Sequence, residues 1–115
     1  MASQLNPDQA ESLTARALKI GDLVNYQSGS IVSRVILKQK TGNVSLFAFD
    51  IGQELSEHTA PFDAMANVLE GEVQVTIAGT PIRVAAGEMI IMPANQPHAL
   101  KAISRFKMML TMIRS

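Results

Sequence analysis

From residue 31 onward, apolar and polar residues alternate with a period of two, which predicts β-strands. The clearest alternation lies in 72–77, where Val73, Val75 and Ile77 fall on one face and the polar residues fall on the other. Glycine or proline separates such segments at intervals of roughly 8–12 residues, a spacing typical of β-sandwiches and barrels. The pattern therefore predicts an all-β domain.

Several of these segments are apolar on both faces. Beside Phe106 the second face carries Met109 and Ile113. A strand in the wall of a single barrel should have a solvent-exposed outer face, and Lys101 and Lys107 are expected there. Strands that are apolar on both faces must be covered on the outer face, either by a second copy of the chain or by the N-terminal segment. We favour a homodimer.

The first thirty residues lack this alternation. Asn6, Pro7 and Gln9 form the start signature of a helix over 6–18, and Gly21 is a plausible end for it. An extended arm is the alternative. We therefore divide the chain into an N-terminal arm or short helix at 1–30 and a barrel at 31–115.

Composition limits the partners. The chain has 115 residues, of which 47% are hydrophobic and 17% are charged, and its formal net charge is zero. These values predict one folded domain that binds neither nucleic acid nor a membrane surface. There is no cysteine, so a metal would need histidine, carboxylate or other oxygen ligands. No signal pattern or long apolar run is present, and a cytoplasmic location is the default expectation.

The only two histidines stand in two spaced motifs. In "GQELSEHTAPFDAMANVLEG", five residues separate Gly52 from His58. In "GEMIIMPANQPHALKA", five residues separate Gly87 from Pro93, and four more precede His98. Together these spacings resemble the two signature motifs of the cupin superfamily, in particular its small conserved-barrel members.

This resemblance implies a cupin-type double-stranded β-helix, an RmlC-like jelly-roll barrel that is commonly dimeric. It also implies a metal in the barrel mouth, held by two histidines and a carboxylate from the first motif and one histidine from the second. His58 and His98 match the first and last of these ligands, whereas Ala60 and Ala64 stand at the other two positions. Asn95 replaces a glycine of the second motif, which is tolerable because asparagine also adopts left-handed backbone conformations.

A metal site with His58, His98 and Asp63 is one interpretation, with zinc, manganese, iron or nickel as the ion. Two imidazoles alone would hold a metal weakly. Side chains alternate along a strand, so Asp63, one residue from the family's carboxylate position, should point away unless a bend re-aims it. The alternative role for Asp63 is to cap the bend after Pro61. No cofactor is certain from these residues.

Our first functional hypothesis is a binding cavity for a small, polar or anionic organic ligand, lined by His58, His98, Phe47 and Met65. Two imidazoles can hold a carboxylate or enolate and transfer protons near neutral pH. Phe47 and Met65 could instead be core residues. The alternatives are a metal-dependent dioxygenase or isomerase and a dimeric structural domain with a vestigial site. The sequence leaves open whether the protein is an enzyme.

Overall fold

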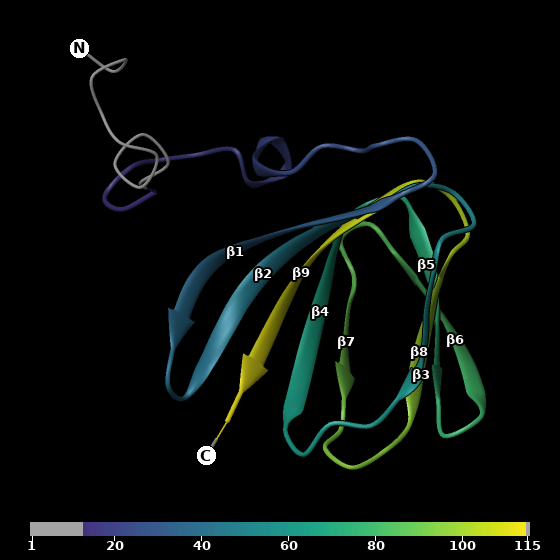
Figure 1. The fold of residues 1–115 in the computed structure, drawn as a ribbon. Coiled ribbons are helices and arrows are strands. Elements are labelled where there is room, and N and C mark those ends of the chain that lie inside the picture. The colour runs from purple at the N-terminus through teal and green to yellow at the C-terminus, as the bar shows by residue number, and fades with distance from the viewer. Residues whose placement is uncertain (1–12, 115) are drawn as a thin grey trace.

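The computed structural model describes residues 13–114, which form nine antiparallel β-strands and one short 3-10 helix (Figure 1). The elements are η2 (Ile20–Leu23), β1 (Ile31–Gln39), β2 (Gly42–Phe49), β3 (Glu54–His58), β4 (Asp63–Glu70), β5 (Glu72–Ile77), β6 (Thr80–Ala85), β7 (Met89–Met92), β8 (His98–Ala102) and β9 (Phe106–Ile113). Among these described residues, no helix is long and apolar enough to cross a membrane.

The strands form two sheets that face each other. One sheet has the order β1-β2-β9-β4-β7, and the other has the order β3-β8-β5-β6. Figure 1 shows the two sheets meeting at one end and opening toward the other, where the β3–β4 and β7–β8 loops lie. This arrangement confirms the predicted all-β barrel.

The core lies between the sheets and follows the predicted alternation. Val73 and Val75 of β5 are fully buried, as are Phe106 and Met108 of β9. The ring of Phe106 stacks on that of Phe49 with 4.5 Å between centroids, which joins neighbouring strands β2 and β9 on their inward face. The apolar positions read from the sequence are therefore the ones that bring the two layers together.

Two tight turns set the loops around the barrel. Gly71, between β4 and β5, has a φ of 73°, and a Cβ there would collide with the carbonyl oxygen of Arg105. Asn95, in the β7–β8 loop, has a φ of 66°, which confirms the left-handed conformation predicted for it.

The N-terminal segment (residues 13–30) differs from the predicted helix. The start of that helix lies outside the described residues. Residues 13–18 are not helical, because Ala15 has a φ of 59°, which interrupts a right-handed helix. Gly21 lies inside η2 and does not end an α-helix.

This segment covers part of the outer face of the five-stranded sheet. Val24 is buried against Leu46 and Ala48 of β2, with further apolar residues packed around them. Lys107 lies on the same face, and its predicted exposure is wrong. Only 7% of it is exposed, and its Nζ donates a 2.6 Å hydrogen bond to the carbonyl oxygen of Gly21. Strand alternation places Lys107 outside the barrel but could not reveal the segment above it.

Candidate functional site

The alternation of inward and outward side chains along β8 determines the direction of His98. His98, Leu100 and Ala102 are the buried residues of this strand, and the latter two belong to the core between the sheets. His98 therefore points into the barrel near the open end, and only 6% of it is exposed.

A bulge in β3 aims His58 at the same place. Leu55 pairs with Leu100, and His58 pairs with His98, so three residue steps on β3 oppose two on β8. Leu55 packs against the core. Without the extra residue, side chains three positions apart would lie on opposite faces. The bulge therefore returns His58 to the inward face, beside His98.

The two imidazole rings form a close pair. Their centroids are 4.3 Å apart with an interplanar angle of 67°, and Nε2 of His98 lies 3.1 Å from Nε2 of His58. The Nδ1 atom of His58 lies 2.9 Å from the carbonyl oxygen of Ser56, and Nδ1 of His98 lies 3.2 Å from that of Gln96. Carbonyl oxygens of β3 and of the β7–β8 loop thus contact the two rings from behind.

These contacts determine where the hydrogens are. A carbonyl oxygen only accepts, so a hydrogen bond to it requires a hydrogen on each Nδ1. If both rings were neutral, the two Nε2 lone pairs would then face each other at 3.1 Å. One added proton between them satisfies all four ring nitrogens. The pair is therefore suited to hold one positive charge, or another group that binds two converging nitrogen lone pairs.

The surroundings oppose a second charge. Burial lowers the pKa of His98 below its usual value of 6.5, and a positive charge on His58 lowers it further, whereas the contact with Gln96 raises it. Burial therefore favours the neutral form of the His98 ring.

The donors near the pair do not fit the metal site that the sequence resemblance implies. Ala60 and Ala64 bear no ligand atoms. The carboxylate of Asp63 accepts a 2.8 Å hydrogen bond from the N–H of Ala94, which ties the start of β4 to the β7–β8 loop. Within residues 13–114, no group of three or more histidine, aspartate or glutamate side chains is arranged to hold a metal ion. Two imidazoles fall short of the three protein ligands typical of catalytic zinc.

Phe47 and Met65 lie on different faces. Phe47 packs against the core between the sheets, with its ring centroid 6.2 Å from that of Phe49. Met65 stands between Ala64 and Ala66, which both point into that core. Met65 therefore lies on the outer face of β4, and the structure does not bring it to the histidines.

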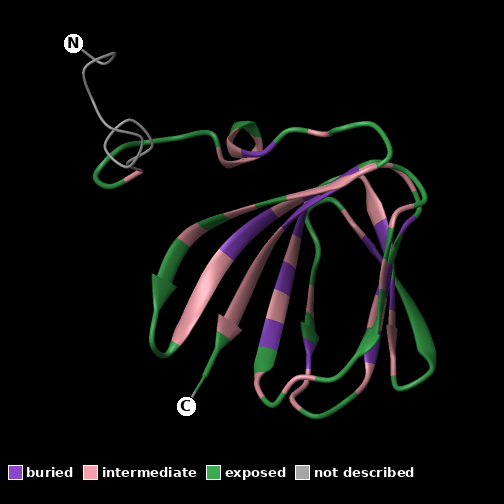
Figure 2. Ribbon diagram, in the orientation of Figure 1, coloured by how far each residue is buried: buried purple, intermediate pink, exposed green. Residues whose placement is uncertain are grey.

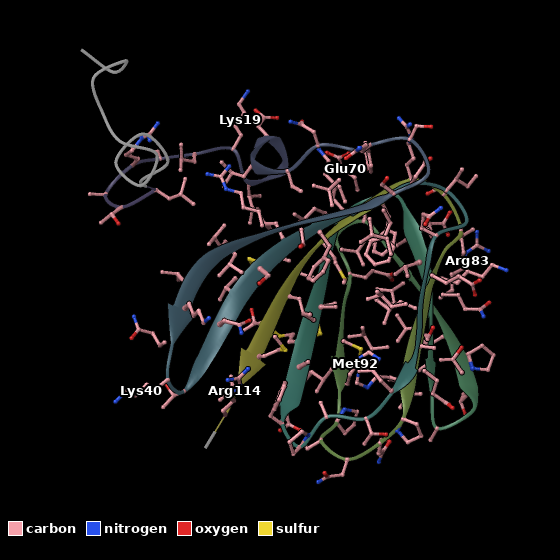
Figure 3. All side chains as sticks on the ribbon, in the orientation of Figure 1. Lys19, Lys40, Glu70, Arg83, Met92 and Arg114 are labelled. Atoms are coloured by element: carbon pink, nitrogen blue, oxygen red, sulfur yellow. The ribbon has the colours of Figure 1, made fainter. Side chains whose placement is uncertain are left out.

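Pairing between strands identifies apolar residues that share the interior with the histidines. On β4, Ala64 pairs with Met92 of β7 on one side and with Met112 of β9 on the other. Met92 is 2% exposed, and Figure 3 labels it in the space between the two sheets. Strand alternation places Met89 and Met92 on opposite faces, but the unbroken apolar run "MIIM" does not show which of them points inward until the register with β4 is known.

The comparisons with known proteins agree with this architecture. The family model described as the cupin domain matches residues 45–114. A conserved protein of unknown function from Streptococcus pyogenes is 35% identical, with a TM-score of 0.84 over 88% of this chain and 89% of that one. A cupin superfamily protein from Desulfitobacterium hafniense is 25% identical, with a TM-score of 0.83 over 88% of this chain and 93% of that one.

A third similar structure belongs to a larger protein. The cupin 2 conserved barrel domain protein from Leptotrichia buccalis is 36% identical with a TM-score of 0.79, and the match covers 82% of this chain but 46% of that one. A search of curated proteins found no match. The family match over residues 45–114 and the two inward-facing motif histidines lead to one conclusion: this chain belongs to the cupin family.

Proposed function

We propose that this protein binds a small organic acid in the barrel mouth, with His58 and His98 as the polar anchor. The observation that carries the proposal is the convergence of two Nε2 atoms at 3.1 Å while main-chain carbonyls hold both Nδ1 atoms. Met92 and Met112 provide an apolar surface in the same interior for the carbon skeleton of the ligand. Small-molecule sites in proteins combine an apolar lining with a few fixed polar groups.

The hydrogen bonding of the pair defines the ligand further. A ligand that displaces the contact between the rings must accept the hydrogen of one Nε2 and donate a hydrogen to the other, or a nitrogen is left unpaired at the expected cost of about 1–3 kcal/mol. A carboxylate next to a hydroxyl group offers both. His58 is exposed and can move aside, whereas His98 is buried and fixed. We therefore favour a small 2-hydroxy acid over a simple carboxylate.

Calorimetric titration with lactate and propionate tests the proposal, because propionate has the same length but lacks the hydroxyl. Lactate is expected to bind more tightly than propionate, by about tenfold if one unpaired nitrogen costs about 1.4 kcal/mol. His58→Ala and His98→Ala should each weaken lactate binding at least tenfold, and Gln74→Ala, at an exposed position of β5, should leave it unchanged. Lactate binding that survives both histidine substitutions would refute the proposal, as would no binding by either acid.

A metal-dependent cupin enzyme is the second candidate, and one observation favours it. Each histidine directs Nδ1 to a carbonyl oxygen, as metal-ligating histidines commonly do. Only two donors converge, however, and Asp63 is engaged with Ala94. Titration of zinc, manganese, iron and nickel into the purified protein decides between the two. Stoichiometric metal binding that raises the melting temperature and depends on Asp63 would favour the metal-dependent enzyme over the organic-acid site.

A further inference from the structure

A groove lies on the outer face of the five-stranded sheet, between the N-terminal segment and β1. Figure 1 shows this segment passing above β1. The groove has a volume of about 610 Å³, within the roughly 300–1,000 Å³ typical of small-molecule sites. We call it the outer groove. Neither histidine lines it, so it is separate from the site in the barrel mouth. The lining residues that determine its chemistry are Leu18, Ile20, Leu23, Arg34, Ile36 and Leu37.

The walls of the outer groove are mainly apolar, and part of this apolar surface is exposed. Ile20, Leu23 and Ile36 pack against the buried cluster that the N-terminal segment forms with β2, so they hold their positions. Leu18 is 37% exposed and Leu37 is 61% exposed. Figure 2 shows exposed residues along both the N-terminal segment and the far end of β1. A hydrocarbon chain lying in the groove would remove this apolar surface from water, which is favourable.

A positive charge lies in this apolar setting without a carboxylate partner. Arg34 is half-buried, and its Nη1 donates a 3.1 Å hydrogen bond to the carbonyl oxygen of Leu23. Within residues 13–114, its guanidinium forms no ion pair, whereas Arg83 and Arg105 each meet a carboxylate. No acidic side chain among these residues lines the groove. The bond to Leu23 uses only one of several guanidinium N–H groups, so donors remain for an anion.

We infer that the outer groove binds a medium-chain fatty acid, with its carboxylate on Arg34 and its hydrocarbon chain running toward Leu37. The planar guanidinium matches a planar carboxylate. Arg16, which also lines the groove, is engaged in an interaction of its own, so the ligand meets the single charge of Arg34. A carboxylate carries one negative charge, whereas a phosphate monoester carries nearly two and would be incompletely matched.

The length of the groove along β1 sets the length of the chain. Arg34 and Leu37 are three residue steps apart, a distance of about 10 Å at about 3.4 Å per residue. An extended chain of about eight carbons is about 9 Å long. Octanoate therefore fits this span, and octan-1-ol is the same chain without the charge.

Calorimetric titration of the full chain with octanoate and with octan-1-ol tests the inference. Octanoate should bind about tenfold more tightly than octan-1-ol, because a hydrogen-bonded charge pair adds to the shared apolar contact. Arg34→Met should remove this advantage and leave octan-1-ol binding unchanged, since methionine keeps an unbranched apolar side chain. Arg34→Lys, which keeps the charge, should retain part of the advantage. Arg83→Met, at an exposed position of β6, is the matched control and should change neither affinity.

Leu37→Gln tests the apolar wall. It should weaken the binding of octanoate and of octan-1-ol by the same factor, because the two ligands share one hydrocarbon chain. Leu37 is more than half exposed and Arg34 is half-buried, so these variants should fold, and circular dichroism melting of each variant checks this. His98→Ala should leave octanoate binding unchanged, because the barrel mouth is a separate site.

Four results would overturn the inference. The first is no binding of octanoate. The second is equal affinity for octanoate and octan-1-ol, which would show that the charge of Arg34 is not used. The third is octanoate binding that His98→Ala abolishes and Arg34→Met does not, which would place the acid in the barrel mouth. The fourth is an octanoate affinity that falls as the protein concentration rises, which would show that a second copy of the chain covers the groove.

Discussion

Two polar clusters lie at opposite ends of this barrel, and they use their charges differently. One is the histidine pair at the open end. The other, which we call the clasp, lies under the N-terminal segment and is formed by Tyr26, Asp50, Glu70, Arg105 and Lys107. Figure 3 labels Glu70 beside this segment, above the closed end of the barrel.

In the clasp, every charge meets an opposite charge or a dipole. Lys107 Nζ lies 3.5 Å from Glu70, which accepts a 2.9 Å hydrogen bond from the hydroxyl of Tyr26. The Arg105 guanidinium donates a 2.8 Å hydrogen bond to Asp50. The N–H of Gly29, the guanidinium of Arg105 and the N–H of Ile51 together lower the pKa of Asp50 to about 2. The clasp is thus already satisfied and holds the N-terminal segment on the sheet.

The histidine pair lacks such compensation. Two identical bases face each other, and the nearby Asp63 is bonded to the main chain of Ala94. A cluster whose partners all lie within the chain stabilises the fold, whereas a cluster with unused hydrogen-bonding capacity is available to a ligand. This comparison predicts that substitutions in the clasp mainly change stability and that substitutions in the pair mainly change binding.

The largest effect is expected for Lys107→Ala. The substitution leaves the carbonyl oxygen of Gly21 without the donor that buried Lys107 supplies, and it removes the contact with half-exposed Glu70. Loss of a hydrogen bond to a charged group should reduce the free energy of unfolding by about 1.5–3 kcal/mol. Chemical denaturation measures it. Lys101→Ala, on the exposed face of β8, is the control and should change stability by no more than about 0.5 kcal/mol. Equal effects of the two would contradict the described role of the clasp.

The second prediction concerns Tyr26, the only tyrosine in a chain without tryptophan. Burial raises its pKa from 10.0 to about 12, with further contributions from its hydrogen bond to Glu70 and from the charge of Glu70, while Arg105 acts in the opposite direction. Because the folded-state pKa is raised, the stabilisation is complete below pH 10 and is lost as the pH rises toward 12.

The near-ultraviolet absorbance of tyrosinate measures this titration directly. Glu70→Gln removes the negative charge but keeps an acceptor for the hydroxyl, so the midpoint should fall part of the way toward 10. A midpoint near 10 in the unaltered folded protein would show that the clasp does not hold the tyrosine.

The contrast between the clusters also explains how far the sequence could predict the structure. The alternating pattern predicted the inward residues of β5 and β9, because a strand with one buried face fixes its own register. The clasp was not predictable, since Lys107 and Gly21 lie 86 positions apart and no local pattern connects them. The motif spacing predicted that both histidines lie in the barrel mouth. It could not show their close pairing, which depends on a bulge in β3.

The third prediction is a small effect on stability at the pair. His58 is exposed, and its ring contacts one main-chain carbonyl and His98. His58→Ala should change the free energy of unfolding by no more than about 0.5 kcal/mol, well below the effect of Lys107→Ala. Chemical denaturation under the same conditions gives the comparison. A loss as large as that of Lys107→Ala would mean that the pair is chiefly structural, and the distinction between the two clusters would fail.

The last prediction concerns the pH dependence of the pair. Burial, and then the charge of His58, lower the pKa of His98 below 6.5 in the folded protein. The unfolded chain therefore binds more protons below pH 6.5, and stability should decline as the pH falls through that value. Nuclear magnetic resonance titration of the imidazole C–H signals, of which this chain has only two sets, should show one set with a depressed midpoint.

His58→Gln separates the two causes of this shift. Glutamine removes the neighbouring positive charge but not the burial, so the His98 midpoint should rise only part of the way toward 6.5. A complete return of the His98 midpoint to 6.5 would mean that charge repulsion, and not burial, causes the shift. No change would mean that the rings do not titrate as a pair in solution. In that case the 3.1 Å contact between the Nε2 atoms could not define the ligand, and the 2-hydroxy acid would lose its advantage over a simple carboxylate.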